Sequence, residues 1–328
     1  MGVSAAGGKR MQGTTGRSAV VRKALALLSV LTSCAYSHAE FSIADDGAAL
    51  FLYENHKLVL GFSYRSPTIP DAPAQDAPRP AFGYIDPLFD LEGHTLTGSG
   101  ENGPGGLFWC WAGQSEYGDF DLCAGVGAER VFERKIHAVA EPDRASLAYQ
   151  YAWLDPSTGG AFAIETVRID IESSLPTQRL LELEITLRNV SGSVLTLNSP
   201  AAPRTVGLHL VTNPQRSFSG VALVPDEEVT TAGNWASVSL RIPRSSRYSG
   251  IAIFPSPENP ETTRPHWMIP RDGVLVAAWP QRATVALRPG EMYRVRYGLY
   301  VHRGQSGRKV MDDAYSEYTQ RGSAAREP

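Results

Sequence analysis

Apolar and polar residues alternate along most of the chain beyond residue 48, which is the pattern of strands that bury one face. The segment 177–189 is the clearest case, because Leu or Ile occupies positions 181, 183, 185 and 187 while polar and charged residues lie between them. One face of this strand therefore packs in a core and the other meets water. The pattern predicts strands over the ranges 49–54, 57–65, 109–112, 120–124, 146–154, 161–172, 177–189, 194–197, 221–224, 235–242, 250–254, 274–279, 283–287 and 292–301.

Turn residues separate these strands, at Asn55-His56 and over 155–160, for example. One helix is predicted over 308–321, where Val310, Ala314 and Tyr318 recur four apart. Many short strands and almost no helix predict an all-β fold, a large antiparallel two-sheet sandwich with a short C-terminal helix. We expect one such domain over 40–322 and a disordered tail over 323–328.

A proline-rich stretch over 66–80 interrupts the strand pattern. Proline removes the donor that a strand ladder needs, so this stretch is predicted to be an extended surface loop.

The first 39 residues contain five Lys or Arg residues and no acidic residue, and an apolar run over 24–31 follows the basic positions. This is the pattern of a secretory signal, and the run is too short to span a bilayer, which takes about 20 residues. Cleavage after Ala39 would release the protein to the periplasm or the exterior. A lipobox ending at Cys34, with a signal over 1–33, would instead anchor it to the outer membrane. Both alternatives stay open, as does a start at Met11 rather than Met1.

Without residues 1–39 the chain carries 26 basic and 34 acidic residues, or a formal charge of −8, which argues against a nucleic-acid partner. The predicted strands 109–112 and 120–124 place Cys110 nearly opposite Cys123. A disulfide there would add about 3 kcal/mol of stability on the chain-entropy model. The alternative is a pair of buried free thiols.

Several short motifs make the chain resemble a poorly characterised bacterial family whose members are often labelled PmoA-like. The motifs are GYIDPLF at 83–89, EGHTLT at 92–97, GLFWCW at 106–111, KIH at 135–137, WLDP at 153–156, IET at 164–166, GIAIF at 250–254, PENP at 257–260, HW at 266–267 and YVHRG at 300–304. The resemblance implies a galactose-mutarotase-like supersandwich with a concave face where such folds bind sugars. A membrane copper oxygenase is not implied, because the chain lacks several apolar spans and a His-rich site.

The chain departs from that family at two places. The family's Asp-His-Pro-His-His-Arg-Gly run before the Leu-Phe-Trp strand is replaced here by Glu-Asn-Gly-Pro-Gly-Gly at 101–106. A Gly-Leu-Arg pattern of the family reads Gly207-Leu208-His209. If the missing residues transfer protons in the family, this protein has lost that function.

Acid–base chemistry on a sugar needs a general base and a general acid about one ring apart. Glu165 with His137 or His209 is the candidate catalytic set, and His94, Glu101 and His266 are candidate ligand-binding residues. No two histidines have a recognised metal-ligand spacing, so neither a metal nor a cofactor is predicted. Each histidine has the alternative of being a surface or core residue.

Trp109, Trp111, Trp235 and Trp267 are the candidate aromatic contacts to a sugar ring. Trp109 and Trp111 are two apart and share one face of a strand. The alternative is that all four belong to the sandwich core. Three functions follow: a saccharide-binding protein without catalysis, a sugar-modifying enzyme, or a structural envelope protein.

Overall fold

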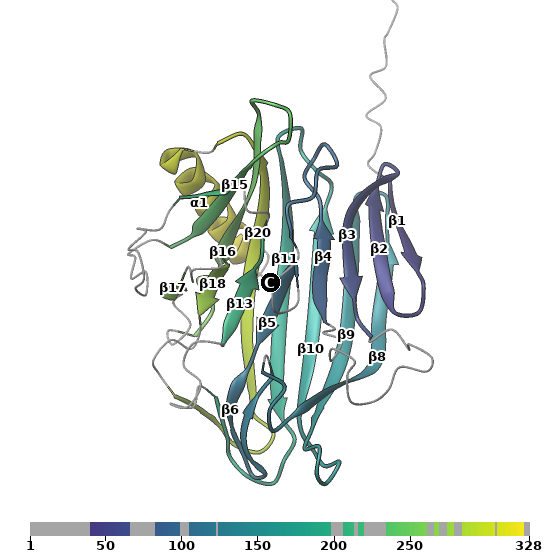
Figure 1. Cartoon of the computed structure of the whole chain (residues 1–328), viewed down its shortest axis with the longest axis vertical. Helices are drawn as coiled ribbons and strands as arrows, with labels where there is room; N and C mark the ends of the chain where they lie inside the picture. Colours follow the sequence, from purple (N-terminus) through teal and green to yellow (C-terminus); the bar gives the residue numbers. More distant parts are fainter. Residues whose placement is uncertain are drawn as a thin grey trace, which may run out of the picture. The chain divides into compact units, whose positions relative to one another are not determined.

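The computed structural model describes residues 40–65, 83–98, 105–122, 124–197, 206–212, 216–219, 234–260, 266–268, 274–278, 284–305 and 307–324. The chain divides into two units, residues 1–37 and 38–328, and the described residues all lie in the second. They form three antiparallel sheets and one C-terminal helix (Figure 1). The expected all-β sandwich with a C-terminal helix is confirmed.

The first sheet has eight strands in the order β1-β2-β3-β4-β5-β13-β18-β17. Asn55 and His56 join the second and third strands with positive φ angles, which suits a tight hairpin turn. The bounds are β1 Phe41–Asp45, β2 Ala49–Glu54, β3 Lys57–Ser63, β4 Tyr84–Leu88, β5 Leu107–Cys110, β13 Gly207–Leu210, β17 His266–Met268 and β18 Leu275–Ala278.

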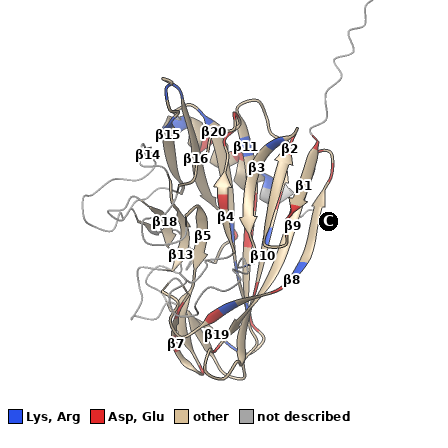
Figure 2. Ribbon diagram, turned by 45° about the vertical axis from the view of Figure 1, so that its right-hand side comes forward, with Lys and Arg blue, Asp and Glu red and all other residues tan. Residues whose placement is uncertain are grey.

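The second sheet also has eight strands, in the order β14-β15-β16-β20-β11-β10-β9-β8. Strands β10 and β11 are long and alternate between buried and more exposed positions over most of their length, as the sequence pattern predicts. The bounds are β8 Glu129–Ala140, β9 Arg144–Leu154, β10 Ala161–Glu172, β11 Gln178–Asn189, β14 Arg216–Ser219, β15 Ala236–Arg241, β16 Tyr248–Pro255 and β20 Met292–Arg303. Figure 2 shows acidic and basic positions interspersed along these strands.

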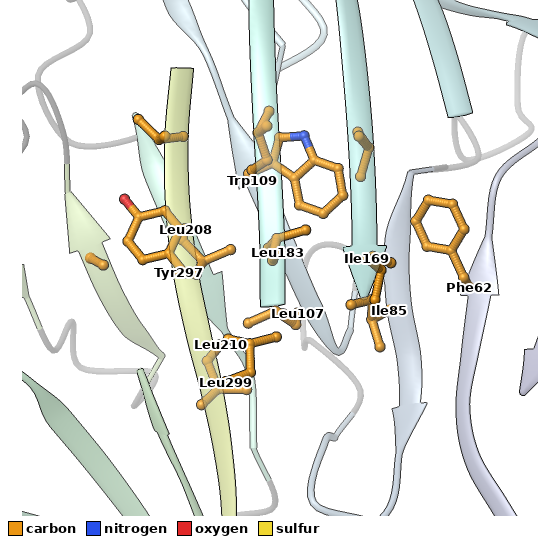
Figure 3. Packing of buried hydrophobic residues seen from close by; sticks show 14 of the residues in the cluster. Phe62, Ile85, Leu107, Trp109, Ile169, Leu183, Leu208, Leu210, Tyr297 and Leu299 are labelled. Carbon is orange, nitrogen blue, oxygen red and sulfur yellow. The ribbon is translucent and has the colours of Figure 1, made fainter. Parts of the chain in front are cut away.

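The two large sheets face each other across one hydrophobic core. Figure 3 shows how the first sheet contributes Phe62, Ile85 and Leu208, while the second contributes Ile169 and Leu183. All five side chains are at most 2% exposed. Burial of such side chains from two facing sheets is what holds a sandwich together.

The small sheet has four strands in the order β19-β12-β6-β7. Their bounds are β6 Ala112–Ser115, β7 Gly118–Asp121, β12 Leu195–Leu197 and β19 Val285–Leu287. This sheet corrects the predicted strand 109–112, because Trp109 and Cys110 end β5 of the first sheet while Ala112 begins β6 of the small sheet. Gly113 must be glycine, since a Cβ there would lie 1.9 Å from the carbonyl oxygen of Thr196.

The helix α1 runs over Arg308–Ala324, so residues 323 and 324, predicted to belong to the tail, are helical. Met311 and Tyr318 pack with Phe254 and Tyr300 on the outer side of the second sheet. Tyr300 of β20 is the ladder partner of Ala252 of β16. The helix therefore covers one part of the second sheet, as a C-terminal cap.

Most predicted strands correspond to observed ones within two residues. The predicted strand 221–224 and the proline-rich loop 66–80 lie outside the described residues. Strands β1, β4, β6, β8, β13, β14 and β17 were not predicted. Strand β8 is an edge strand with two register shifts, which breaks the alternation that sequence patterns rely on.

Candidate functional site

The outer face of the first sheet carries a pair of stacked rings. In β5 the side chains of Leu107 and Trp109 belong to the core, and in β13 those of Leu208 and Leu210 do. Residues between them point to the opposite face, since side chains alternate along a strand. That alternation sends Phe108 and His209 outward.

Phe108 and His209 are direct partners in the ladder between β5 and β13. Their ring centroids lie 4.8 Å apart and their planes differ by 13°, which is a stacked arrangement. Both side chains are half-buried. The antiparallel pairing of Ile85 with Leu107 places Tyr84, also half-buried, beside Phe108 on the same face. An aromatic row therefore crosses three neighbouring strands.

Polar groups from β4 and the loop after it adjoin this aromatic row. Asp86 is half-buried and accepts a hydrogen bond of 2.6 Å from the hydroxyl of Thr97. Thr97 in turn accepts one from the backbone N–H of Leu88. Gly106 keeps β5 close to β4, because a Cβ at its φ of +80° would lie 2.2 Å from the carbonyl oxygen of Ile85. We call Tyr84, Asp86, Phe108 and His209 the outer-face site.

Glu165 lies behind this site, in the core between the two large sheets. It is completely buried on β10. Its Oε1 accepts a hydrogen bond of 2.7 Å from the indole N–H of Trp109 and a second bond from the guanidinium of Arg130. Its Oε2 is buried and has no hydrogen-bond partner. A buried carboxylate with only one oxygen satisfied is uncommon, because burial of an unpaired polar atom costs free energy.

Arg130 reaches Glu165 from the edge strand β8, and its side chain is 12% exposed. The guanidinium lies 4.1 Å from the ring centroid of Tyr151 and 5.3 Å from that of Trp109, so it makes cation–π contacts with both. It also approaches the carbonyl oxygen of Gly83 at 3.4 Å. Burial raises the pKa of Tyr151, so its hydroxyl stays neutral beside the cation.

The third member of the expected catalytic set, His137, lies on the outer face of the second sheet. Its Nε2 is 2.8 Å from the hydroxyl of Ser146, which donates to Asp170. Glu165 is in the core and His209 is on the outer face of the first sheet. The structure thus places the three residues on three separate faces, and the expectation that they converge on one sugar ring is corrected. The three residues separate because alternation along a strand sets which face of its own sheet a side chain occupies. Spacing along the chain does not show which faces of different sheets meet.

The four tryptophans named as candidate contacts to a sugar ring are all buried. Trp109, Trp111 and Trp267 belong to the main core, and Trp111 packs edge-on against Trp153 with ring centroids 5.8 Å apart. Trp235 lies under α1 and donates a hydrogen bond to Asp312. These side chains stabilise the fold, as the alternative interpretation held.

The remaining candidates take separate positions. His94 is half-exposed and contacts Asp90, whose carboxylate also accepts the backbone N–H of Glu92 and so closes a turn. His266 begins β17 opposite Ala278. Glu101, Cys34 and Cys123 lie outside the described residues, while Cys110 is buried at the end of β5. The disulfide and the lipid anchor stay predictions.

Two negative findings apply to the described ranges alone. No group of three or more His, Cys, Asp or Glu side chains there is arranged to hold a metal ion. No helix there is long and apolar enough to cross a membrane.

Sequence reasoning missed Tyr84, Asp86, Phe108 and Arg130. Phe108 stands between two inward residues of an otherwise apolar motif, so strand parity was the signal that marks it as outward-facing. Arg130 had no comparable signal, because β8 lacks alternation and the residue is 35 positions from Glu165.

A family model described as a family of unknown function, DUF6807, matches residues 49–316. No curated protein sequence matches the chain.

The chain is similar to several solved structures at low sequence identity. An α-galactosidase of glycoside hydrolase family 36 from Geobacillus stearothermophilus is 11% identical with a TM-score of 0.36, over 82% of this chain and 41% of that one. The polysaccharide lyase BACCELL_00875 is 9% identical with a TM-score of 0.34, over 82% and 33% of the two chains. A homologue of aldose epimerase from C. elegans is 12% identical with a TM-score of 0.25, over 80% and 99%. This chain spans about two fifths or less of the length of the first two enzymes.

Proposed function

Because the chain belongs to the DUF6807 family, whose function is unknown, we propose a function from the site itself: the protein binds a saccharide at the outer-face site, without catalysis. The observation that carries this proposal is the half-buried stack of Phe108 on His209. Aromatic faces pack against the apolar C–H faces of sugar rings, and polar groups at the edge of the ring fix its orientation.

The polar neighbours of the stack suit hydroxyl groups. The carboxylate of Asp86 accepts hydrogen bonds, and the imidazole of His209 and the phenol of Tyr84 both donate and accept. Together with Phe108, these groups come from β4, β5 and β13, three adjacent strands of one sheet. A sheet face is a rigid support, which keeps the cost of ordering the site low when a ligand binds.

Catalysis is less well supported than binding. A general acid and a general base must each lie within hydrogen-bond reach of the reacting atoms. Glu165 and His137 lie on faces other than that of His209. The resemblance to the PmoA-like family points the same way, because the His-His-Arg run of that family is absent at 101–106.

A ligand screen by thermal shift, followed by calorimetry, tests the proposal. The panel contains mono- and oligosaccharides, including uronic acids, at millimolar concentration. We expect at least one to raise the melting temperature, by the equivalent of about 2.7 kcal/mol at 100 times its Kd. The substitution Phe108→Ala should weaken that binding about tenfold, the scale of one lost aromatic contact.

The matched control is Tyr117→Ala, which removes a 41%-exposed aromatic ring from the turn between β6 and β7. This variant should bind the saccharide like the wild type. A panel without any stabilisation contradicts saccharide binding and favours the structural envelope role.

We also propose that the protein is exported, either released after Ala39 or acylated at Cys34. The basic, acid-free leader and its short apolar run support export. Mass spectrometry of the mature protein from a bacterial host should find an N-terminus at Glu40 or a lipid-modified Cys34. An unprocessed N-terminus at Met1 or Met11 would contradict export.

A further inference from the structure

Glu165 joins two strands of different sheets through one oxygen atom. Its Oε1 accepts the indole N–H of Trp109 in β5 and a guanidinium N–H of Arg130 in β8. Trp109 faces the core and follows Phe108, which stacks on His209 on the outer face of β5. The hydrogen bond to Trp109 therefore fixes the strand directly beside the aromatic stack. The geometry of the outer-face site thus depends on a contact in the core.

Arg130 extends the same connection to β4. Its guanidinium lies 3.4 Å from the carbonyl oxygen of Gly83, the residue that precedes Tyr84. A Cβ at Gly83 would lie 2.2 Å from a guanidinium nitrogen of Arg130, and the φ of +75° at this residue also favours glycine. The residue that precedes β4 is therefore in direct contact with the arginine.

The connection is made at a cost, because the Oε2 of Glu165 is buried without a partner. A carboxylate kept solely for stability would have both oxygens satisfied, as those of the buried Glu54 are. The unsatisfied oxygen indicates that the role of Glu165 is to fix the positions of Trp109 and Arg130.

We propose that Glu165 is a positioning residue: it holds β4 and β5 in register against the second sheet, through Arg130 and Trp109, and so sets the arrangement of Tyr84, Asp86, Phe108 and His209. The inference rests on the proposed saccharide-binding function for its consequence, but the positioning itself is independent of any ligand.

The test compares Glu165→Gln with Glu54→Gln. Both residues are buried carboxylates paired with an arginine. The partner of Glu54 reaches the carbonyl oxygen of Phe89, just after β4, whereas the partner of Glu165 reaches that of Gly83, just before β4. Backbone hydrogen exchange is measured for each variant without ligand. In Glu165→Gln we expect exchange to speed up about tenfold or more over 84–88 and 107–110 relative to 49–54, while in Glu54→Gln the faster exchange is confined to 54, 89 and 173–179. Equal acceleration across the first sheet in Glu165→Gln would overturn the proposal.

Saccharide affinity is the second readout. Glu165→Gln should raise the Kd of the saccharide found for the wild type by about fivefold or more, and Glu54→Gln should leave it unchanged. Unchanged affinity in Glu165→Gln overturns the proposal. If no saccharide binds the wild type, the proposed function fails, while the exchange pattern still decides the positioning role.

If Glu165→Gln does not fold, Trp109→Phe replaces it, because this change keeps the ring in the core and removes the indole donor. It should speed exchange over 107–110 and leave 84–88 near the wild-type rate, since the link from Arg130 persists. Equal effects on both segments would contradict two separate links through Glu165.

Discussion

Two buried ion pairs differ in how completely their polar atoms are satisfied. The pair of Glu54 with Arg179 joins the two large sheets, whereas Glu165 and Arg130 both belong to the second sheet. In the pair of Glu54 with Arg179 both side chains are 5% exposed, and Ser174 donates its backbone N–H and hydroxyl to the carboxylate. Arg179 also donates to Ser174 and to the carbonyl oxygen of Phe89. In the pair of Glu165 with Arg130 one carboxylate oxygen takes both donors and the other has none.

The comparison separates a stabilising contact from a positioning one. A buried ion pair offsets its desolvation only when hydrogen bonds satisfy the remaining atoms. The cluster around Glu54 meets this condition and fastens the end of β2 to the start of β11. Burial lowers the pKa of Arg179, and the adjacent Glu54 opposes that shift by favouring the cation. The cluster around Glu165 leaves the condition unmet, which fits a role in geometry rather than stability.

The largest expected effect is the loss of stability in Glu54→Ala. Removal of one partner leaves Arg179 buried and uncompensated, which should lower the free energy of unfolding by about 3–5 kcal/mol. Glu165→Ala should cost less, because Arg130 is more exposed than Arg179 and the change also removes the unsatisfied oxygen. Urea unfolding of both variants measures the difference. A larger loss in Glu165→Ala would reverse the comparison.

The buried residue His302 adds a contribution to stability that depends on pH. Its Nε2 lies 3.1 Å from the hydroxyl of Ser237, and burial lowers its pKa from 6.5 to about 4. Between these values the unfolded chain binds a proton that the folded protein does not, so stability falls as the pH drops. The wild type should lose about 3 kcal/mol from pH 7 to pH 4 through this residue.

The control for that effect is His302→Gln, because other groups also titrate in acid. The difference in unfolding free energy between wild type and variant, followed by urea titration at each pH, isolates the histidine. The variant curve should be flatter between pH 6.5 and 4. Parallel curves would mean that His302 takes up its proton at the same pH in the folded protein as in the unfolded chain.

The sequence by itself determined the strand content and the face of most strands. Alternation over 161–172 and 177–189 is local, and local burial preference reproduces it. The parity of 161–172 also puts Glu165 among the inward positions with Val167 and Ile169. The edge strand β8 was not predicted, because its polar residues show no period and two register shifts interrupt its pairing.

The tertiary structure alone decided which residues meet. Phe108 and His209 stack across a ladder of strands 101 positions apart, and Trp109 reaches Glu165 across 56 positions and between two sheets. Such pairs depend on strand order and on how the sheets face each other, and both arise from packing of the whole core. Side-chain pattern fixes the face of a residue, whereas only the assembled sandwich fixes its neighbour, so the acid–base set separated while an unpredicted aromatic pair came together.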